Sequence, residues 1–178
     1  EDGSVEDPKP EDLYAYGTLA QVLKVFDMPD NSKSAIVQGI SRVKILDYIK
    51  LEPYFSTAVE SMEDKPSADQ LEVDALTTNL RQAFEDLMKV APNLTEEHSG
   101  MLKNIQKPNR LTDRAISVIT ISNQEKQEIL EELDIKKRIE KALNLISREI
   151  KRIKLGEEIQ SEVHDEITKT KREYYLRE

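Results

Sequence analysis

The sequence is short of several residue types that protein chemistry commonly uses. It has no cysteine and no tryptophan, and only five of its 178 residues are glycine. Without cysteine there is no disulfide framework and no thiolate-ligated zinc. The glycines are too widely spaced to form a P-loop or a dinucleotide-binding fingerprint. No apolar run approaches the roughly 18 residues that a membrane-spanning helix needs, so we expect no membrane partner.

Aromatic residues are also scarce, whereas charged residues are abundant. Six tyrosines and three phenylalanines are few for a large β-core, so the composition favours helices. The formal net charge is −9, and the excess of acidic residues lies before residue 134. One later stretch, 136–154, is basic, with eight Lys or Arg and two Glu residues. Because the acidic body repels phosphate, we interpret this stretch as a solvated helix face with intrahelical ion pairs and expect no nucleic-acid partner.

No group of residues has the spacing of a catalytic or metal-binding site. The two histidines, His98 and His164, fall in different predicted helices, among polar neighbours and without a His-Glu-x-x-His spacing. Ser41 and Lys44 match the Ser-x-x-Lys of acyl-serine enzymes. On a strand, however, residues three apart point to opposite faces, so this lysine cannot activate this serine. We expect no catalytic residue, no cofactor and no metal ion in this chain.

The β-structure is predicted within residues 1–64. The acidic residues 1–12, twice interrupted by proline, are interpreted as a disordered loop or tail. Stretches rich in β-forming residues then alternate with turn residues, which predicts four strands, at 17–26, 34–40, 42–46 and 54–60. The first two strands form a hairpin. A sheet this small leaves edges that need covering.

Residues 65–133 are predicted to be helical. Short breaks are expected at two prolines and one capping serine, Pro92, Pro108 and Ser122. Ser67 followed by Gln70 is a capping-box match for the start of the first helix. Thr95 is the expected cap of a second, shorter helix, and Ser122 with Glu125 repeats the capping-box pattern further on.

Residues 134–178 are predicted to form one long helix, with Asp134 as its N-cap. Its first apolar residues alternate in steps of four and three, the pattern of a helix that packs on a partner: Ile139, Leu143, Ile146, Ile150 and Ile153. The apolar residues beyond them are spaced by four only: Ile159, Val163 and Ile167. We therefore expect the helix to be docked up to about residue 155 and to project beyond it. Gly156 is interpreted as a tolerated helix glycine rather than a hinge.

Four stretches of the sequence resemble a known family. They are 12–23, 28–30 and 37–42 near the N-terminus, and 171–178, which contains the run Arg-Glu-Tyr-Tyr-Leu. Together they resemble the N-terminal domain of the Lon ATP-dependent protease family. The resemblance implies an α+β, mostly α fold. It would have a partial PUA-like β-subdomain in 1–64, a helical subdomain in 65–133 and a long projecting C-terminal helix in 134–178.

The resemblance also implies a function. The chain would be a piece of a longer protein, without the family's first β-strands and without its ATPase and peptidase domains. That parent would be an ATP-dependent serine endopeptidase, a homohexamer using ATP and Mg, in the cytoplasm or alternatively in the mitochondrial matrix. This chain would be its non-catalytic N-terminal region, which engages unfolded or damaged protein substrates and supports hexamer assembly.

Candidate contact residues follow from this expectation. Substrate contacts are expected at large apolar side chains of the β-region, although core or edge packing is the simpler explanation for each: Met28, Tyr54, Phe55 and Met62. Contacts between subunits are expected along the distal helix: Ile159, Val163 and Ile167. The alternative function is that of a helical structural adaptor, which binds a folded partner through its C-terminal coiled-coil helix and handles no substrate.

Overall fold

The computed structural model describes residues 7–175, except for the side chains of Asp165 and of residues 170–175. Expectations for residues 1–6 and 176–178 fall outside this range. The chain divides into two compact units. Unit 1 consists of Glu1–Ser67 and Ser122–Ile135, and unit 2 of Ala68–Ile121 and Lys136–Glu178. Among the described residues, no helix combines the length and apolar character needed to cross a membrane.

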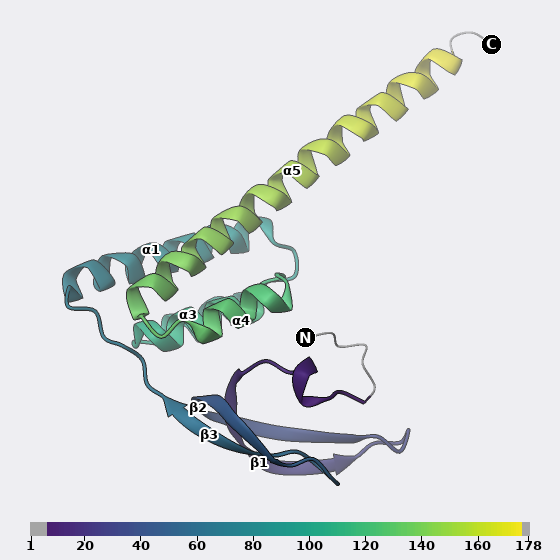
Figure 1. The fold of residues 1–178 in the computed structure, drawn as a ribbon. Coiled ribbons are helices and arrows are strands. Elements are labelled where there is room, and N and C mark those ends of the chain that lie inside the picture. The colour runs from purple at the N-terminus through teal and green to yellow at the C-terminus, as the bar shows by residue number, and fades with distance from the viewer. Residues whose placement is uncertain (1–6, 176–178) are drawn as a thin grey trace. The chain divides into compact units, whose positions relative to one another are not determined.

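Unit 1 is built on a three-stranded antiparallel sheet with the order β1-β2-β3 (Figure 1). Its strands are β1 (Tyr16–Asp27), β2 (Lys33–Lys50) and β3 (Ser56–Met62). The predicted β-region is therefore confirmed, but the expected second and third strands are one continuous strand. Ala20 pairs with Gly39 and Leu19 with Ser41, so Ile40 is an extra residue in β2. A β-bulge of this kind accommodates one residue without ending the strand.

Two short helices complete unit 1. A 3-10 helix, η1 (Pro10–Asp12), lies within the segment that was expected to be a disordered loop or tail. Its first turn is closed by the Lys9 backbone N–H, which donates to the Asp12 carboxylate at 2.9 Å. The second helix, α4 (Asn123–Glu131), begins with the predicted capping box, in which Ser122 accepts from the Glu125 N–H at 3.3 Å and donates its own N–H to the Glu125 carboxylate at 3.0 Å.

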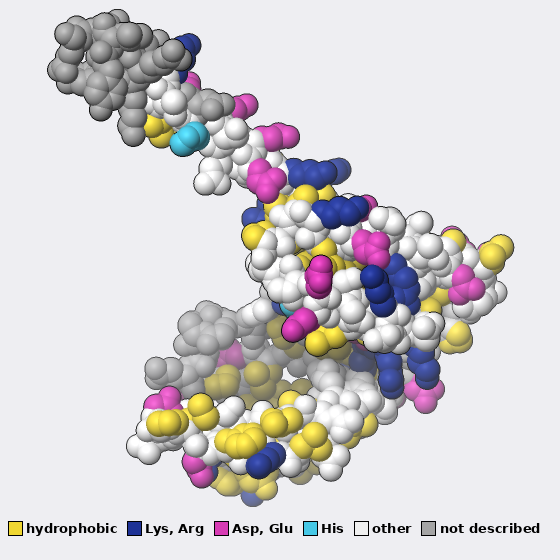
Figure 2. All heavy atoms as spheres, turned by 180° about the vertical axis from the view of Figure 1, so that it is seen from behind, with side chains coloured by type: hydrophobic (Ala, Val, Ile, Leu, Met, Phe, Trp, Pro, Cys, Tyr) yellow, Lys and Arg dark blue, Asp and Glu magenta, His cyan; other side chains and the backbone are white. Residues whose placement is uncertain are grey.

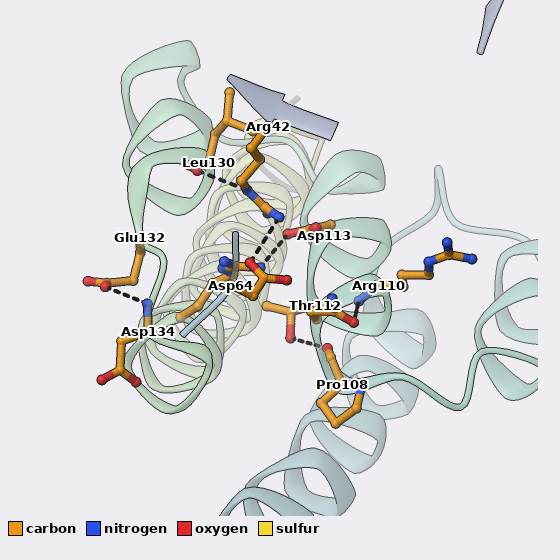
Figure 3. Close-up of polar contacts among 11 residues, drawn as sticks. Arg42, Asp64, Pro108, Arg110, Thr112, Asp113, Leu130, Glu132 and Asp134 are labelled. Carbon is orange, nitrogen blue, oxygen red and sulfur yellow. Dashed lines mark hydrogen bonds and ion pairs between the residues drawn. The ribbon is translucent and has the colours of Figure 1, made fainter. Parts of the chain in front are cut away.

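Helix α4 is attached to the sheet by side chains that reach backbone carbonyls. The Gln127 amide donates to the Tyr16 carbonyl at 3.0 Å. The Arg42 guanidinium donates to the Leu130 carbonyl at 3.0 Å and lies 3.4 Å from the Asp64 carboxylate (Figure 3). The sequence predicts this segment to be part of the helical subdomain. Its contacts with β1 and β2 instead make it part of the β-unit.

The described part of unit 2 contains four helices: α1 (Gln70–Val90), α2 (Glu96–Lys103), α3 (Pro108–Val118) and α5 (Ile135–Tyr175). The first residue of α5 still belongs to unit 1. The N-cap of α1 is Asp69, which accepts from the Glu72 N–H at 3.0 Å, and not the predicted Ser67. Asp69 stands directly before the first helical residue, where an N-cap side chain reaches an N–H of the first turn, whereas Ser67 lies two residues further from the helix. Helix α2 begins at the predicted Thr95.

The core of unit 2 forms where the first half of α5 packs with the shorter helices. On α5 the most deeply buried apolar residues are Ile139, Ala142 and Ile146. Leu143, Ile150 and Ile153, which the sequence also assigned to the seam, are half-buried. The shorter helices contribute the buried residues Leu80, Phe84, Leu87, Leu111, Ala115 and Ile116. The predicted long helix is therefore confirmed, and it continues through Gly156 as helix.

Two charged residues are buried in the same unit. Arg138 is fully buried, and its guanidinium lies 3.7 Å from the Asp113 carboxylate. Glu149 is also buried and accepts two hydrogen bonds from Arg152, at 2.8 and 2.6 Å. Buried charges are tolerated when they are paired in this way, because an unpaired charge in the interior is costly. The basic stretch of α5 is thus only partly a solvated face.

A polar substitution in the seam is expected to unfold unit 2. Ile146→Asp would place a carboxylate where no part of the side chain reaches solvent. Burying an unpaired carboxylate costs several kcal/mol, a large share of a domain's stability. We expect loss of the cooperative thermal transition of unit 2, measured by circular dichroism. Ser147→Asp, at the next and exposed position, is the control and should melt like the unsubstituted chain.

Candidate functional site

The described residues hold no group of three or more His, Asp or Glu side chains that could bind a metal ion. His98 is engaged locally, because its Nδ1 accepts from the Thr95 N–H at 3.1 Å. Ser41 and Lys44 lie in a regular part of β2, so their side chains point to opposite faces of the sheet. The Lys44 ammonium lies 5.6 Å from the centre of the Tyr16 ring. In this arrangement Lys44 does not approach Ser41.

The most unusual surface of unit 1 is one face of the β1–β2 hairpin. Cross-strand partners share a face of the sheet, and three successive pairs on this face are apolar or glycine: Ala20 with Gly39, Val22 with Val37, and Val25 with Ala35. The three valines are each more than half-exposed, Ala20, Ala35 and Gly39 are exposed as well, and no polar side chain separates the pairs. We call these six residues the hairpin face.

The opposite side of the same hairpin is mixed in character. There the partners are Gln21 with Gln38, Lys24 with Ile36, and Phe26 with Ser34. The Lys24 ammonium lies 4.8 Å from the centre of the Phe26 ring and partly covers it. A half-buried sheet normally presents one apolar and one polar face, with the apolar one packed on a core. Here the apolar face is open to solvent among the described residues.

The alignment of the hairpin face depends on a second bulge. Val22 pairs with Val37 and Lys24 with Ile36, so Leu23 is an extra residue in β1. Without it, strict alternation would place Val22 and Val25 on opposite faces. With it, both valines lie on the same face. The bulge therefore concentrates the apolar side chains on one side of the hairpin.

The sheet also has unpaired strand edges. β2 pairs with β1 from Lys33 to Lys44, and with β3 from Arg42 to Lys50. Only three residues of β2, 42–44, therefore have a described strand partner on both sides. Elsewhere one edge of β2 has no strand partner in the described part of the chain, and such edges can pair with another extended segment.

The four predicted substrate-contact residues do not form one site. Met28 lies in the β1–β2 turn and is exposed. Tyr54 and Phe55 lie in the β2–β3 connection, at the other end of the 18-residue β2. Met62 pairs with Arg42 near the middle of β2 and is half-buried. Of the four, Met28 lies next to the hairpin face, at the turn that closes this hairpin.

The β1–β2 turn next to Met28 is held by backbone and side-chain bonds. The Met28 N–H donates to the Ser32 carbonyl at 2.9 Å, and Asn31 adopts a positive φ of 63°. The Asp30 carboxylate accepts from the Ser32 hydroxyl at 2.6 Å, which lowers the pKa of Asp30. Phe55, in contrast, packs edge-to-face on Tyr48, with ring centres 5.6 Å apart. Phe55 thus packs against a residue of β2.

Sequence reasoning missed the valines of the hairpin face. The stretches that hold them were predicted as strands, but period-two alternation alone does not reveal a bulge. A signal is present in the printed sequence: Ala20, Val22, Leu23, Val25 and Phe26 are too apolar for a strand with one solvated face. A strand this rich in apolar residues needs either the rest of the fold to cover both of its faces or a binding partner to cover one of them.

The second exposed apolar surface lies on the distal half of α5. Leu155, Ile159, Val163 and Ile167 follow one another in steps of four and are 56%, 52%, 50% and 49% exposed. We call these four residues the distal line. The residues expected to contact another subunit are therefore exposed, as a contact surface requires. Exposure alone does not identify what binds there.

The chain matches one family model and a set of curated relatives. The model of the ATP-dependent protease La (LON) substrate-binding domain matches residues 1–148. Lon protease of Koribacter versatilis is 38% identical over 175 residues, which is 98% of this chain and 22% of that protein. Lon protease of Dictyoglomus thermophilum is 36% identical over 174 residues, with the same coverage of both chains. The chain thus spans about a fifth of the length of these relatives.

Solved structures give the same fold. The N-terminal domain of Mycobacterium avium complex Lon protease superposes with a TM-score of 0.64 at 22% identity, covering 79% of this chain and 74% of that one. The Lon N-terminal domain protein from Xanthomonas campestris superposes with a TM-score of 0.50 at 18% identity, covering 74% of this chain and 68% of that one. At these identities the likeness establishes the fold.

Proposed function

Because the chain belongs to the family of Lon substrate-binding domains, we propose that it engages unfolded or damaged polypeptides through the hairpin face. The observation that carries this proposal is a run of apolar cross-strand pairs, Val22 with Val37 foremost, that is exposed on one side of the hairpin. Folded proteins rarely leave such a surface open unless something binds there. An unfolded polypeptide exposes apolar side chains that a folded protein buries. An apolar surface would therefore bind the unfolded polypeptide in preference to the folded protein.

The open edges of β2 support the same proposal. An extended segment that pairs with a free strand edge gains backbone hydrogen bonds irrespective of its sequence, and its alternate side chains then lie on one face of the sheet. Residues 33–41 of β2 have β1 on one side and no described strand on the other. A substrate segment bound there would place alternate side chains beside Val37 and Ala35. Backbone pairing would allow segments of many different sequences to bind, and the apolar face would favour those with apolar side chains.

Substitution on the hairpin face should weaken binding of an unfolded polypeptide. Val22→Glu introduces a carboxylate that must be desolvated when an apolar segment docks, which costs more than the roughly 1–3 kcal/mol of a neutral polar group. We therefore expect the dissociation constant for fluorescein-labelled casein, measured by fluorescence anisotropy, to rise by on the order of tenfold or more.

The matched control is Gln21→Glu, which adds the same charge at the next residue but on the opposite face. It should change the dissociation constant by less than about twofold. Circular dichroism melts of both variants establish that the sheet is intact. Equal weakening by the two substitutions would show that added negative charge, and not the hairpin face, governs binding.

The chain by itself should carry out no chemistry. Ser41 and Lys44 point to opposite faces of the sheet, and the described residues hold no metal-binding carboxylate cluster. The printed sequence contains no P-loop glycine pattern. We expect no ATP hydrolysis and no casein cleavage above the buffer rate in coupled-enzyme and gel assays. ATP turnover that persists through repurification of the chain would contradict this expectation.

We further propose that the distal line supports self-association, and through it hexamer assembly of the longer protein. Val163→Asp should reduce self-association in sedimentation velocity without lowering the melting temperature, since Val163 is half-exposed and packs on no core. Ser161→Asp is the control, because it adds the same charge at an exposed position off the line. A melting temperature that falls as far as that of Ile146→Asp would mean that the distal helix folds back on unit 2.

The remaining proposals concern the longer protein. It would be an ATP-dependent serine endopeptidase that uses ATP and Mg in its other domains and works in the cytoplasm or the mitochondrial matrix. The competing function, a structural adaptor for a folded partner, is not favoured by the family match. Retention of a folded protein but not of unfolded casein in the binding assay would favour the adaptor.

A further inference from the structure

A small pocket lies between the three shorter helices of unit 2. Its volume is about 30 Å³. The floor of the pocket is apolar and buried, and α1, α2 and α3 all contribute to it: Leu80, Phe84, Leu102, Leu111 and Ala115. The rim is polar and more exposed than the floor. All of the lining residues belong to unit 2.

Two small side chains keep the pocket open. Ser99 on α2 and Ala115 on α3 line it, whereas the other apolar lining residues are leucine or phenylalanine. Helix α2 has eight residues, of which only Leu102 is buried, so it closes this side of the core incompletely. The Arg81 guanidinium fixes the end of α2, because it donates to the Leu102 carbonyl at 2.8 Å and to the Ile105 carbonyl. The wall of the pocket is therefore held in place although few of its side chains are buried.

The size of the pocket limits what can occupy it. A water molecule needs about 10–15 Å³ of cavity volume, and a cavity of about 150 Å³ holds a benzene ring. A volume of about 30 Å³ therefore suits about two or three methyl-sized groups and is too small for an aromatic ring. The branched end of a valine or leucine side chain has this size. The apolar floor disfavours a charged or amide side chain, because its polar atoms would lose their hydrogen bonds to water.

The rim of the pocket suits a polypeptide backbone. Glu85 on α1 and Lys103 on α2 carry opposite charges there, and within the described residues neither the carboxylate nor the ammonium forms a hydrogen bond or ion pair. A backbone offers both N–H donors and C=O acceptors, so the carboxylate can accept from one and the ammonium can donate to the other. Figure 2 shows acidic and basic side chains close together on unit 2, between small patches of hydrophobic side chains. A rim of mixed sign favours a neutral ligand over a charged one.

We propose that this pocket binds one leucine or valine side chain from an internal, extended segment of an unfolded polypeptide, with Glu85 and Lys103 contacting the backbone of that segment. The proposal shares only its ligand with the function proposed above and uses none of the residues of the hairpin face. A flat apolar face gains more from a larger side chain, whereas a pocket prefers the side chain that fills it without strain. The pocket would thus add a preference for one type of residue.

The first test compares peptides that differ at one residue. The blocked peptide acetyl-Gly-Ser-Gly-Leu-Gly-Ser-Gly-amide is titrated into the whole chain, and the methyl NMR signals of Leu102, Leu111 and Ala115 report on the pocket. Replacing the leucine of the peptide with glycine should lower the affinity by about tenfold or more, as expected for one buried leucine. Replacing it with tryptophan should also weaken binding, because the ring does not fit. Tighter binding of the tryptophan peptide at these three signals, or no saturable shift with the leucine peptide, would overturn the proposal.

The second test closes the pocket. Ser99→Leu places a leucine side chain in its mouth, so the affinity for the blocked leucine peptide should fall by about tenfold or more. Gly100→Leu is the matched control, since it adds the same side chain at the next, exposed residue of α2, where an added Cβ has open space. Ala115→Val fills the pocket from α3 and should repeat the effect of Ser99→Leu. Circular dichroism melts establish that each variant is folded. Unchanged affinity in the folded Ser99 and Ala115 variants would rule out the pocket as the site.

The two polypeptide sites can fail separately. In the same titration the methyl signals of Val22 and Val37 report on the hairpin face. Shifts confined to these valines would overturn the pocket and leave the hairpin face as the site. Shifts confined to the three pocket signals would support the pocket even if Val22→Glu left casein binding unchanged. A leucine peptide with a free C-terminal carboxylate that binds about tenfold more tightly than the blocked one would show that Lys103 binds a chain end, and would overturn the internal segment.

Discussion

The docked seam of α5 is the constraint on which unit 2 depends. Ile139, Ala142 and Ile146 are fully buried, and they hold together short helices that could not bury their own apolar sides alone. The seam ends because its alternation of four and three gives way to steps of four after Ile153. A line with step four turns away from a flat partner surface, so the same helix is core over its first half and exposed surface over its second.

Exposed apolar surface recurs in unit 1, for a different reason. There the two long strands extend beyond the reach of α4, whose bonds to the sheet involve Tyr16 and Arg42 at the inner end of the hairpin. The outer part of the hairpin has apolar pairs and no described cover. Its turn is nevertheless well ordered by Asp30, Ser32 and Asn31. The hairpin is thus held in shape by backbone pairing and turn chemistry, which leaves its apolar side chains free for contacts with other chains.

Local sequence signals, such as helix caps and prolines, predict most of the fold. The features that they do not predict depend on contacts between residues far apart in the sequence. Pro108 and Ser122 mark helix starts because their effects are confined to one turn. The membership of α4 in the β-unit depends on Arg42 meeting the Leu130 carbonyl 88 residues away, which no local pattern encodes. Likewise, the sequence alone does not distinguish Arg138 from the solvated basic residues around it. Only the fold places Asp113 beside it. The hairpin face was missed because one extra residue, Leu23, reverses the alternation of the strand.

The composition of the hairpin face bears on how tightly it can bind. Its side chains are small: Val22 pairs with Val37, Val25 with Ala35, and Ala20 with Gly39. The surface is therefore shallow and has no deep pocket for one particular residue. Burying a valine or leucine side chain against it is worth roughly 1.5–3 kcal/mol, and ordering a flexible polypeptide offsets much of that gain. Two or three such contacts yield micromolar or weaker binding. If the hairpin face binds polypeptide segments as proposed, a shallow face of this kind would discriminate by apolar content and extension and not by sequence. Weak contacts that form and break quickly would also allow each bound segment to be released.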